Sequence, residues 1–418
     1  MVKIINFLRE GYKNENVTQA FGLLVSTVVG LVLGFATNSL LTRILGKELY
    51  GDYALLFNIY SFCQIIFNFG IFYTISRLVA ITNDKDKARG YYLVGFFFVI
   101  ILFILMAVSV AVYAFFSETM DKSSFFKVLL ISIPLSWIYL LTTLNENYLP
   151  GDNKISLLSW SRLLPKIFLA AILGVIFFYF KNINLVTIVL LNYLTFIIAY
   201  LYVFLKIKPT FKQFKRRLSE ILIGNKQFGF DIYFGALIAS GSGSLSGILI
   251  SHFGVNNVEV GYYTLATLLA SPLSMIPNII ATTQFKKFAQ SSSIPVKLII
   301  TTFGLSIFLM LFIIFASHFI VSIFFGKEYL DSVGMLQYLS LGFVLYGIGD
   351  FFNRFLLAKG KGKELRNASF LVGFTLLIAN ILFIYLYGGD GAAIARVLSG
   401  LMYALVILYY YRKEIKGL

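Results

Sequence analysis

A series of long apolar stretches constrains this chain more than any other feature of its sequence. A transmembrane helix needs about 20 predominantly apolar residues, and lipid offers no hydrogen-bond partner to an open strand edge. Every stretch that crosses the bilayer is therefore expected to be a helix. The sequence predicts an all-α integral membrane protein with twelve transmembrane helices, over residues 18–42, 53–76, 91–116, 124–147, 157–180, 184–205, 229–251, 260–281, 297–324, 334–357, 368–387 and 392–411.

Composition excludes several classes of function. Hydrophobic residues make up 59% of the 418 residues and charged residues only 13%, whereas a soluble domain carries about 25% charged residues. The net charge of +16 is typical of nucleic-acid-binding proteins. Here, however, the Lys and Arg lie in short loops between apolar stretches, so the expected partner is the lipid bilayer and no nucleic acid is expected. The single Cys63 excludes a disulfide framework, and no Cys/His cluster indicates a metal.

The distribution of basic residues predicts the orientation in the membrane. Cytoplasmic loops are enriched in Lys and Arg, and the richest segment, Lys206–Lys226, holds seven of them against one acid, Glu220. With that segment inside, every second loop is basic, and we predict that both termini are cytoplasmic. Basic residues of the inner loops and termini include Lys3, Arg9, Lys13, Lys85, Lys87, Arg89, Lys154, Lys359, Lys361 and Arg412, and those of the outer loops are Arg43, Lys47, Lys122, Lys181 and Lys327.

The two sides of the basic segment resemble each other. Gly51 and Gly261 occupy matching places, and Gly-x-x-x-Gly pairs begin at Gly30 and at Gly243. Such pairs let helices approach closely, and repeated six-helix halves are common in transporters. We predict three parts: an N-terminal six-helix bundle at 1–210, a cytoplasmic basic linker at 211–228, and a C-terminal six-helix bundle at 229–418.

Ionisable side chains inside the predicted spans indicate a functional site. A charge facing lipid costs roughly 3 kcal/mol or more, so such residues normally face a cavity or a partner. Arg162 and Lys166 are four residues apart and share one helix face, with no acid within a turn. Asp350 and Arg354 have the same spacing and form either an internal ion pair or part of a site. Other charged residues in or beside spans are Arg43, Arg77, Glu146, Asp231, His318 and Arg396.

Three segments carry a resemblance to a known family: RILGKELYGDYALL (43–56), FGIFYTISRLVA (69–80) and FFGKEYLDSVGMLQYLSLGFVLYGIGDFFNRFLLAKGKGK (324–363). The chain resembles Wzx-type polysaccharide flippases, which move O-antigen repeat units and belong to the multidrug/oligosaccharidyl-lipid/polysaccharide superfamily. The resemblance implies two pseudo-symmetric six-helix bundles with a MATE-like fold around a central cavity. It also implies a multi-pass protein of the bacterial inner membrane that performs no covalent chemistry.

The resemblance further implies a substrate and a mechanism. An undecaprenyl-pyrophosphate-linked oligosaccharide repeat would move from the cytoplasmic to the periplasmic leaflet by alternating access, for the synthesis of O-antigen, lipopolysaccharide or capsule. No cofactor is expected, and H+ or Na+ is the candidate coupling ion. The expected partners are the lipid-linked glycan, a polysaccharide polymerase and a chain-length regulator.

Site roles follow from the anionic headgroup of that substrate. Arg matches phosphate oxygens with a forked donor and Lys acts as a point charge. For Arg77, the alternative is that the side chain only extends to lipid headgroups. For Glu146, the alternative is that it only pairs with a cation. The predicted substrate-binding residues are Arg162, Lys166, Arg354, Arg77 and Arg396, the coupling or ion-pair residues are Asp350, Asp231 and Glu146, and the sugar-contacting residues are Asn38, Asn145 and Tyr233.

Three alternative functions remain open from the sequence. A multidrug exporter with cation antiport, from the same superfamily, would favour a cavity of acids and aromatic rings. A membrane-embedded glycan polymerase would need a long catalytic outer loop, whereas the predicted outer loops are short. A flippase for a peptidoglycan precursor usually has additional spans.

Overall fold

The computed structural model describes residues 15–116, 124–180, 183–254 and 256–416, and within these ranges the regular structure is helical with no strand. The predicted all-α class is therefore confirmed. The basic residues Lys3, Arg9, Lys13, Lys122 and Lys181, which entered the orientation prediction, lie outside the described residues.

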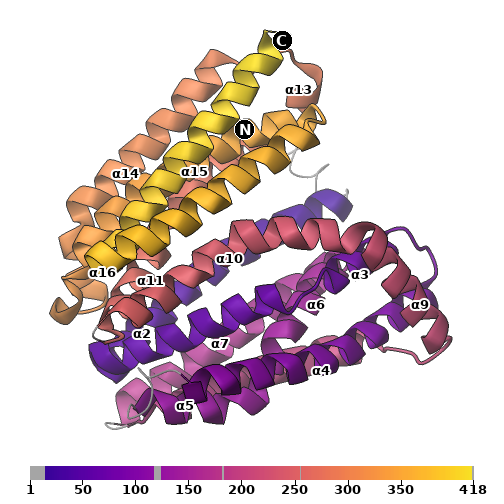
Figure 1. Cartoon of the computed structure of the whole chain (residues 1–418), viewed down its shortest axis with the longest axis horizontal. Helices are drawn as coiled ribbons and strands as arrows, with labels where there is room; N and C mark the ends of the chain where they lie inside the picture. The colour runs from indigo at the N-terminus through magenta and orange to yellow at the C-terminus, as the bar shows by residue number, and fades with distance from the viewer. Residues whose placement is uncertain (1–14, 117–123, 181–182, 255, 417–418) are drawn as a thin grey trace, which may run out of the picture. The chain divides into compact units, whose positions relative to one another are not determined.

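The helices lie over the predicted spans, but the spans 53–76, 124–147 and 260–281 are each divided between two helices. Figure 1 shows how the helices are arranged. In the first part of the chain they are α2 (Glu15–Ile66), α3 (Ile71–Ala80), α4 (Lys85–Phe116), α5 (Ser124–Ser132), the 3-10 turn η2 (Ile133–Leu135), α6 (Trp137–Gly151), α7 (Ile155–Tyr179), α8 (Leu185–Ile207), α9 (Phe214–Gly224) and the π-helical turn η3 (Asn225–Gly229). The remaining helices are α10 (Phe230–Phe253), α11 (Val258–Ala270), α12 (Pro272–Thr283), α13 (Phe285–Gln290), α14 (Val296–Phe324), the 3-10 turn η4 (Lys327–Tyr329), α15 (Ser332–Ala358) and α16 (Gly362–Ile415).

Helix α16 contains two predicted spans, and α2 contains one span and the first part of a second, 53–76, which continues into α3. Among the described residues, eight helices are long and apolar enough to cross a membrane, or ten if each bent pair counts as one span. The longest, α2 and α16, are interrupted by Gly46 (φ 69°, ψ 173°) and Gly388 (φ 57°, ψ −134°). Only glycine adopts such positive φ angles at little cost. Dividing α2 and α16 at these glycines makes the structure consistent with twelve spans.

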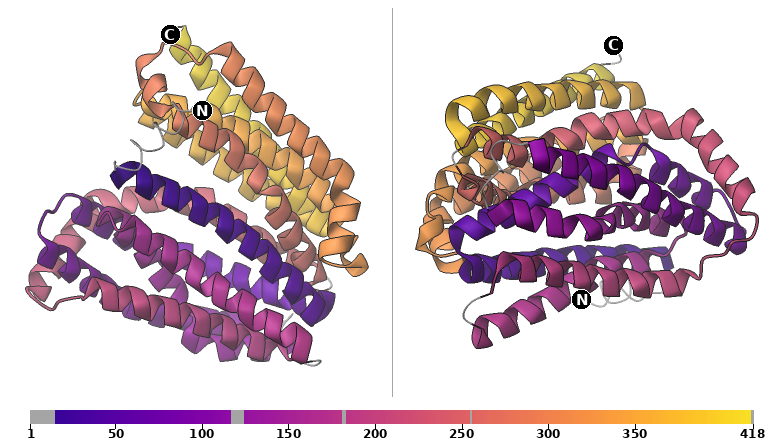
Figure 2. Two further views of the ribbon diagram at one scale, coloured as in Figure 1. Left: turned by 180° about the vertical axis from the view of Figure 1, so that it is seen from behind. Right: turned by 60° about the horizontal axis from the view of Figure 1, so that its bottom comes forward.

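The described residues form two compact units. The first unit contains the described residues up to Ile44 together with Ile66–Tyr233, and the second contains Leu45–Ile65 together with the described residues from Phe234 onward. The core of the first unit includes Tyr92 and Tyr148, whose rings lie 4.8 Å apart. In the second unit α14, α15 and α16, drawn in orange to yellow, lie side by side in both views of Figure 2.

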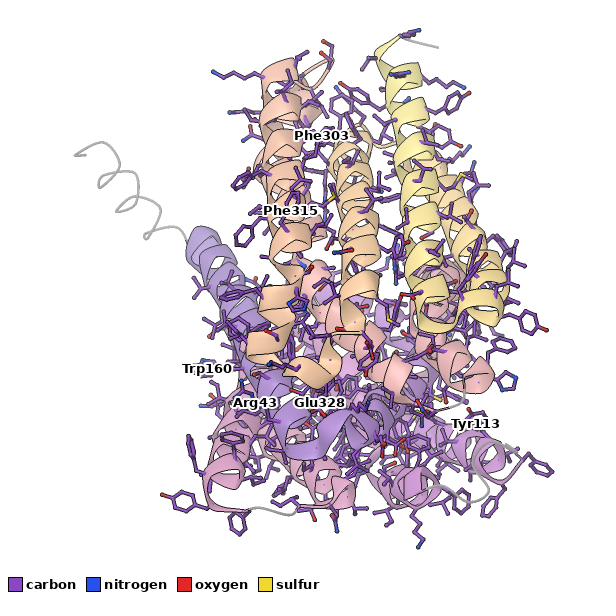
Figure 3. The ribbon with its side chains drawn as sticks, turned by 90° about the vertical axis from the view of Figure 1, so that its left-hand side faces the viewer. Arg43, Tyr113, Trp160, Phe303, Phe315 and Glu328 are labelled. Carbon is purple, nitrogen blue, oxygen red and sulfur yellow. The ribbon has the colours of Figure 1, made fainter. Side chains whose placement is uncertain are left out.

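Helix α14 illustrates how the chain meets an apolar solvent. Phe303 packs edge-on against Phe351 of α15 at 5.5 Å, whereas Phe315 on the same helix is 83% exposed (Figure 3). A large apolar side chain in that position would be unfavourable in water. In a bilayer the same side chain faces acyl chains, which agrees with the apolar composition of the helix.

The predicted basic linker is helical. Helix α9 and the turn η3 pack against α3, and α9 also packs against α4. Glu220, the only acid of Lys206–Lys226, accepts hydrogen bonds from Tyr91 Oη at 2.5 Å and from Arg217 Nη1 at 3.0 Å. Lys87 Nζ lies 3.8 Å from the same carboxylate. Glu220 thereby ties the basic segment to the first turns of α4, as Asp86 does through its ion pair of 2.8 Å with Lys212 Nζ.

The glycines that matched between the two halves contact each other inside the second unit. A Cβ atom on Gly261 would lie 3.1 Å from the ring of Tyr50 and 3.2 Å from the Cα of Gly51. A Cβ atom on Gly51 would overlap the backbone carbonyl of Asn257. The side chain of Asn257 in turn donates to Asp52 Oδ1 at 2.7 Å. The two glycines are needed because their backbones pack without room for a side chain.

Candidate functional site

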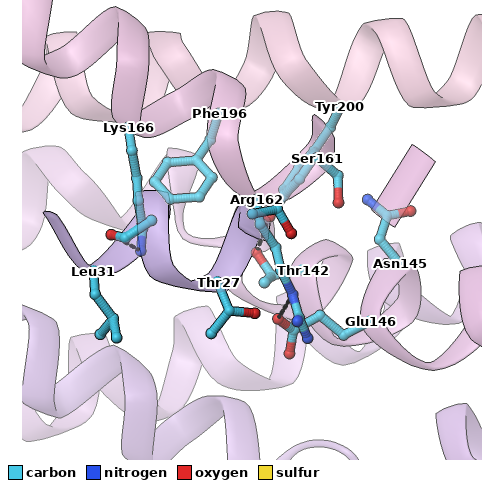
Figure 4. A pocket seen from close by; sticks show the side chains of 12 residues that line it. Thr27, Leu31, Thr142, Asn145, Glu146, Ser161, Arg162, Lys166, Phe196 and Tyr200 are labelled. Carbon is cyan, nitrogen blue, oxygen red and sulfur yellow. Dashed lines mark hydrogen bonds and ion pairs between the residues drawn. The ribbon is translucent and has the colours of Figure 1, made fainter. Parts of the chain in front are cut away.

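A cavity of about 320 Å³ lies inside the first unit, and four helices form its wall. Each helix contributes residues four apart, which therefore point from one face: Ser26 and Gly30 on α2, Thr142 and Glu146 on α6, Arg162 and Lys166 on α7, and Phe196 and Tyr200 on α8. The cavity is lined by Ser26, Thr27, Gly30, Leu31, Thr142, Asn145, Glu146, Ser161, Arg162, Lys166, Phe196 and Tyr200 (Figure 4).

The two predicted cations of α7 meet in this cavity but have different partners. Lys166 Nζ donates to the main-chain carbonyl of Gly30 at 3.0 Å. A Cβ atom on Gly30 would lie 3.4 Å from the ammonium nitrogen, close to ordinary van der Waals contact. Arg162 Nε donates to Glu146 Oε1 at 3.2 Å. The side chains of Arg162 and Glu146 are 43% and 41% exposed, so both remain accessible.

Neutral polar groups complete the wall. The hydroxyls of Thr142 and Tyr200 share a hydrogen bond of 2.6 Å. Asn145 is 1% exposed, and its Oδ1 accepts from Tyr92 Oη at 2.8 Å. With two cations, one carboxylate and several hydroxyls, the cavity carries net positive charge and hydrogen-bonding groups of both kinds. Such a wall suits a ligand that is anionic and rich in oxygen atoms.

The remaining predicted cations do not line this cavity. In the second unit, Arg354 Nε donates to Asn278 Oδ1 at 3.0 Å, and Asp350 Oδ1 accepts from Tyr403 Oη at 2.9 Å. Among the described residues, no ion pair joins Asp350 to Arg354. The internal ion pair that the spacing suggested is therefore absent, because each side chain has a neutral partner on another helix.

Two further cations lie on aromatic rings. The guanidinium of Arg396 lies 5.6 Å from the ring centroid of Phe343 and 5.5 Å from that of Tyr346. The guanidinium of Arg77, near the end of α3, lies 4.3 Å from the ring of Phe228. Cation–π contacts of this kind stabilise a guanidinium without an acid. The predicted substrate contacts of Arg77, Arg354 and Arg396 stay predictions.

Other candidate residues lie outside the wall of the cavity. Asn38 Nδ2 donates to the carbonyl of Gly34 at 2.7 Å on its own helix. Tyr233 Oη donates to the carbonyl of Ile66 at 2.8 Å, where the helical backbone is interrupted. Asp231 is an exposed residue in the first turn of α10. Of the predicted sugar-contacting residues, only Asn145 lines the cavity.

Sequence reasoning missed five of the nine polar residues of the wall. Ser26, Thr27, Thr142, Ser161 and Tyr200 were not predicted as site residues. A signal was present for Thr142, which precedes Glu146 by four residues on the same helix face. The others carry no charge, and a hydroxyl in an apolar helix commonly bonds its own backbone, as Ser161 does with Leu158 at 2.7 Å.

Comparison with solved structures defines the fold. A lipid II flippase, MurJ, in an inward closed conformation matches with a TM-score of 0.71 at 16% identity, covering 94% of this chain and 89% of that chain. An inward-facing multidrug resistance MATE transporter of the MOP superfamily matches with a TM-score of 0.66 at 14% identity, covering 94% and 98%. A MOP superfamily transporter from Pyrococcus furiosus matches with a TM-score of 0.59 at 13% identity, covering 96% and 95%. The predicted MATE-like fold is confirmed.

The sequence also identifies the family. Residues 17–285, more than half of the chain, match the family described as "polysaccharide biosynthesis protein", and this chain belongs to that family. No curated protein sequence matches it. The family is named for polysaccharide biosynthesis, and the fold is shared with solved structures of a lipid II flippase and a multidrug transporter.

Proposed function

We propose that this protein flips an undecaprenyl-pyrophosphate-linked oligosaccharide repeat unit from the cytoplasmic to the periplasmic leaflet, for the synthesis of a surface polysaccharide. The observation that carries the proposal is the pairing of Arg162 and Lys166 in one polar cavity within otherwise apolar helices. Ionisable side chains at membrane depth are costly and mark pathways for polar or charged cargo. The family membership supports a role in polysaccharide synthesis.

In this proposal the two cations bind different oxygen atoms of the pyrophosphate headgroup. Arg162 has a planar fork that matches two phosphate oxygens, and Lys166 provides a compact charge for a neighbouring oxygen. The hydroxyls of Thr142 and Tyr200 would exchange their mutual hydrogen bond for sugar hydroxyls. Coupling to H+ or Na+, and assembly with a polymerase and a chain-length regulator, stay predictions.

The test compares lipid-linked oligosaccharide in cells that lack the gene with cells that carry it back. Deletion should accumulate the lipid-linked repeat on the cytoplasmic side. The wild-type gene should restore flipping, and the double variant Arg162→Ala/Lys166→Ala should not. The matched control is Lys127→Ala, which removes an exposed cation of the first unit that does not line the cavity. Unaltered lipid-linked pools after deletion would refute the proposal.

Glu146 favours a second candidate, export of an organic cation. The carboxylate lies in the same cavity as the rings of Phe196 and Tyr200, and acids with aromatic rings are the typical surroundings of a bound organic cation. Binding assays on the purified protein separate the candidates. A flippase of anionic lipids should bind inorganic pyrophosphate through Arg162 and Lys166, whereas an exporter of cations should bind tetraphenylphosphonium and lose it in Glu146→Gln.

A further inference from the structure

The contact between Arg162 and Glu146 uses only one of the three guanidinium nitrogens. Glu146 accepts from Nε at 3.2 Å, and among the described residues no acceptor contacts Nη1 or Nη2. Lys166, four residues later, has a neutral acceptor in the carbonyl of Gly30. The single carboxylate of the cavity wall is therefore committed to one cation, through the edge of its guanidinium.

This geometry has two consequences for an anionic ligand. A guanidinium is planar, so a hydrogen bond at Nε limits its rotation and fixes the direction of the two terminal nitrogens. Those two nitrogens can bind an oxyanion bidentately. At the same time, the negative charge of Glu146 repels any anion that binds beside Arg162 and weakens its binding. Orientation and repulsion come from the same carboxylate.

We propose that Glu146 is a positioning residue that aims Arg162 at the headgroup and limits how tightly the headgroup binds. The proposal rests on the proposed function and adds the means of release. Affinity differences between similar complexes arise mainly from the dissociation rate, and a flippase must release its cargo in the second leaflet. A cavity with two cations and no acid would hold a pyrophosphate longer, whereas a cavity in which Glu146 opposes them releases it sooner.

Two substitutions separate the two effects. Glu146→Gln keeps an acceptor at the same reach and removes the charge. Glu146→Asp keeps the charge and shortens the side chain by one methylene, which removes the contact with Nε. The matched control is Glu48→Gln, which removes the charge of an exposed acid in the second unit.

The measurement is the binding of inorganic pyrophosphate to the full chain in detergent, together with the rate at which a fluorescent lipid pyrophosphate is flipped in proteoliposomes. Glu146→Gln should bind pyrophosphate about threefold to tenfold more tightly than wild type, because a nearby like charge is removed. Its flipping should show a lower KM and a lower kcat. Glu146→Asp should bind about twofold to fivefold more weakly, because Arg162 loses its orientation. Glu48→Gln should match wild type.

Three results are decisive. Wild-type affinity in Glu146→Gln and Glu146→Asp, with pyrophosphate still bound through Arg162 and Lys166, would overturn the role of Glu146 and leave the proposed headgroup site standing. Weaker binding in Glu146→Gln would overturn it equally, because removal of the charge would then harm binding. Absence of binding in wild type, equal to the double variant Arg162→Ala/Lys166→Ala, would overturn the headgroup site and this inference together.

Discussion

In each unit a cation lies beside a glycine at an equivalent position, but the surroundings of the two cations differ. Gly30 and Gly243 begin the matching Gly-x-x-x-Gly pairs of the two halves. A Cβ atom on Gly30 would lie 3.4 Å from Lys166 Nζ, and one on Gly243 would lie 3.2 Å from Arg396 Nη2. In the first unit the cation lines a cavity together with Arg162. In the second unit the cation lies against two aromatic rings.

This difference teaches that an intramembrane charge is not by itself a binding residue. Arg396 and Arg354 have intramolecular partners that are aromatic or neutral, and Asp350 accepts a hydrogen bond from Tyr403. Arg162 and Lys166 also have partners, but these leave most of their donors unused and accessible. Changes in the cavity of the first unit should therefore affect ligand binding, and changes in the second unit should affect stability.

The largest expected effect comes from removing both cavity cations. Arg162→Ala/Lys166→Ala should lower the flipping rate at least about tenfold, since each charge-assisted hydrogen bond contributes about 1.5–3 kcal/mol. The melting temperature in detergent should stay close to that of wild type, because both side chains are accessible. A normal flipping rate in a folded double variant would contradict the assignment of ligand binding to the cavity of the first unit.

The next effect should appear in the second unit as a loss of stability. Asn380 is fully buried, and its Nδ2 donates to the carbonyl of Ser242 at 3.0 Å and to Ser246 Oγ at 2.9 Å. Asn380→Leu should destabilise the protein by about 1–3 kcal/mol, because buried acceptors lose their donor. Thermal unfolding in detergent measures this change. Pyrophosphate affinity should be unchanged. A loss of binding without a loss of stability would contradict the structural role assigned to Asn380.

A smaller loss of stability is expected where a cation rests on aromatic rings. Arg396→Lys keeps the charge but removes the planar group between Phe343 and Tyr346, which should cost about 1 kcal/mol. The same thermal unfolding experiment applies. If the variant instead keeps its melting temperature and loses flipping, Arg396 contacts the substrate, as the sequence predicted.

The smallest effect should follow from neutralising the acid of the second unit. Asp350→Asn keeps an oxygen that accepts from Tyr403 Oη, so stability should change by less than about 1 kcal/mol. Pyrophosphate affinity should stay within about twofold of wild type, because Asp350 does not line the cavity. The contrast with Glu146→Gln, which should bind more tightly, tests whether the two acids differ in role. Equal tightening in both variants would remove the distinction between the units.

Much of the fold followed from apolar length alone, because every span must be a helix in lipid. The groups that each charged side chain contacts could not be predicted from the sequence. The four-residue spacing placed Arg162 and Lys166 on one face correctly, and the same spacing for Asp350 and Arg354 suggested an ion pair that the structure lacks. Spacing fixes which residues share a face, but another helix supplies the partner, as Asn278 does for Arg354.

The sequence by itself determined the all-helical membrane architecture, the basic central segment and the cationic pair of α7, because each depends on composition or on spacing within one helix. Only the tertiary structure decided that Glu146 accepts a hydrogen bond from Arg162, that Tyr200 and Thr142 complete the cavity wall, and that Arg396 lies over aromatic rings. These contacts join residues from different helices. Their distances depend on how helices pack, and residue spacing within one helix does not predict them.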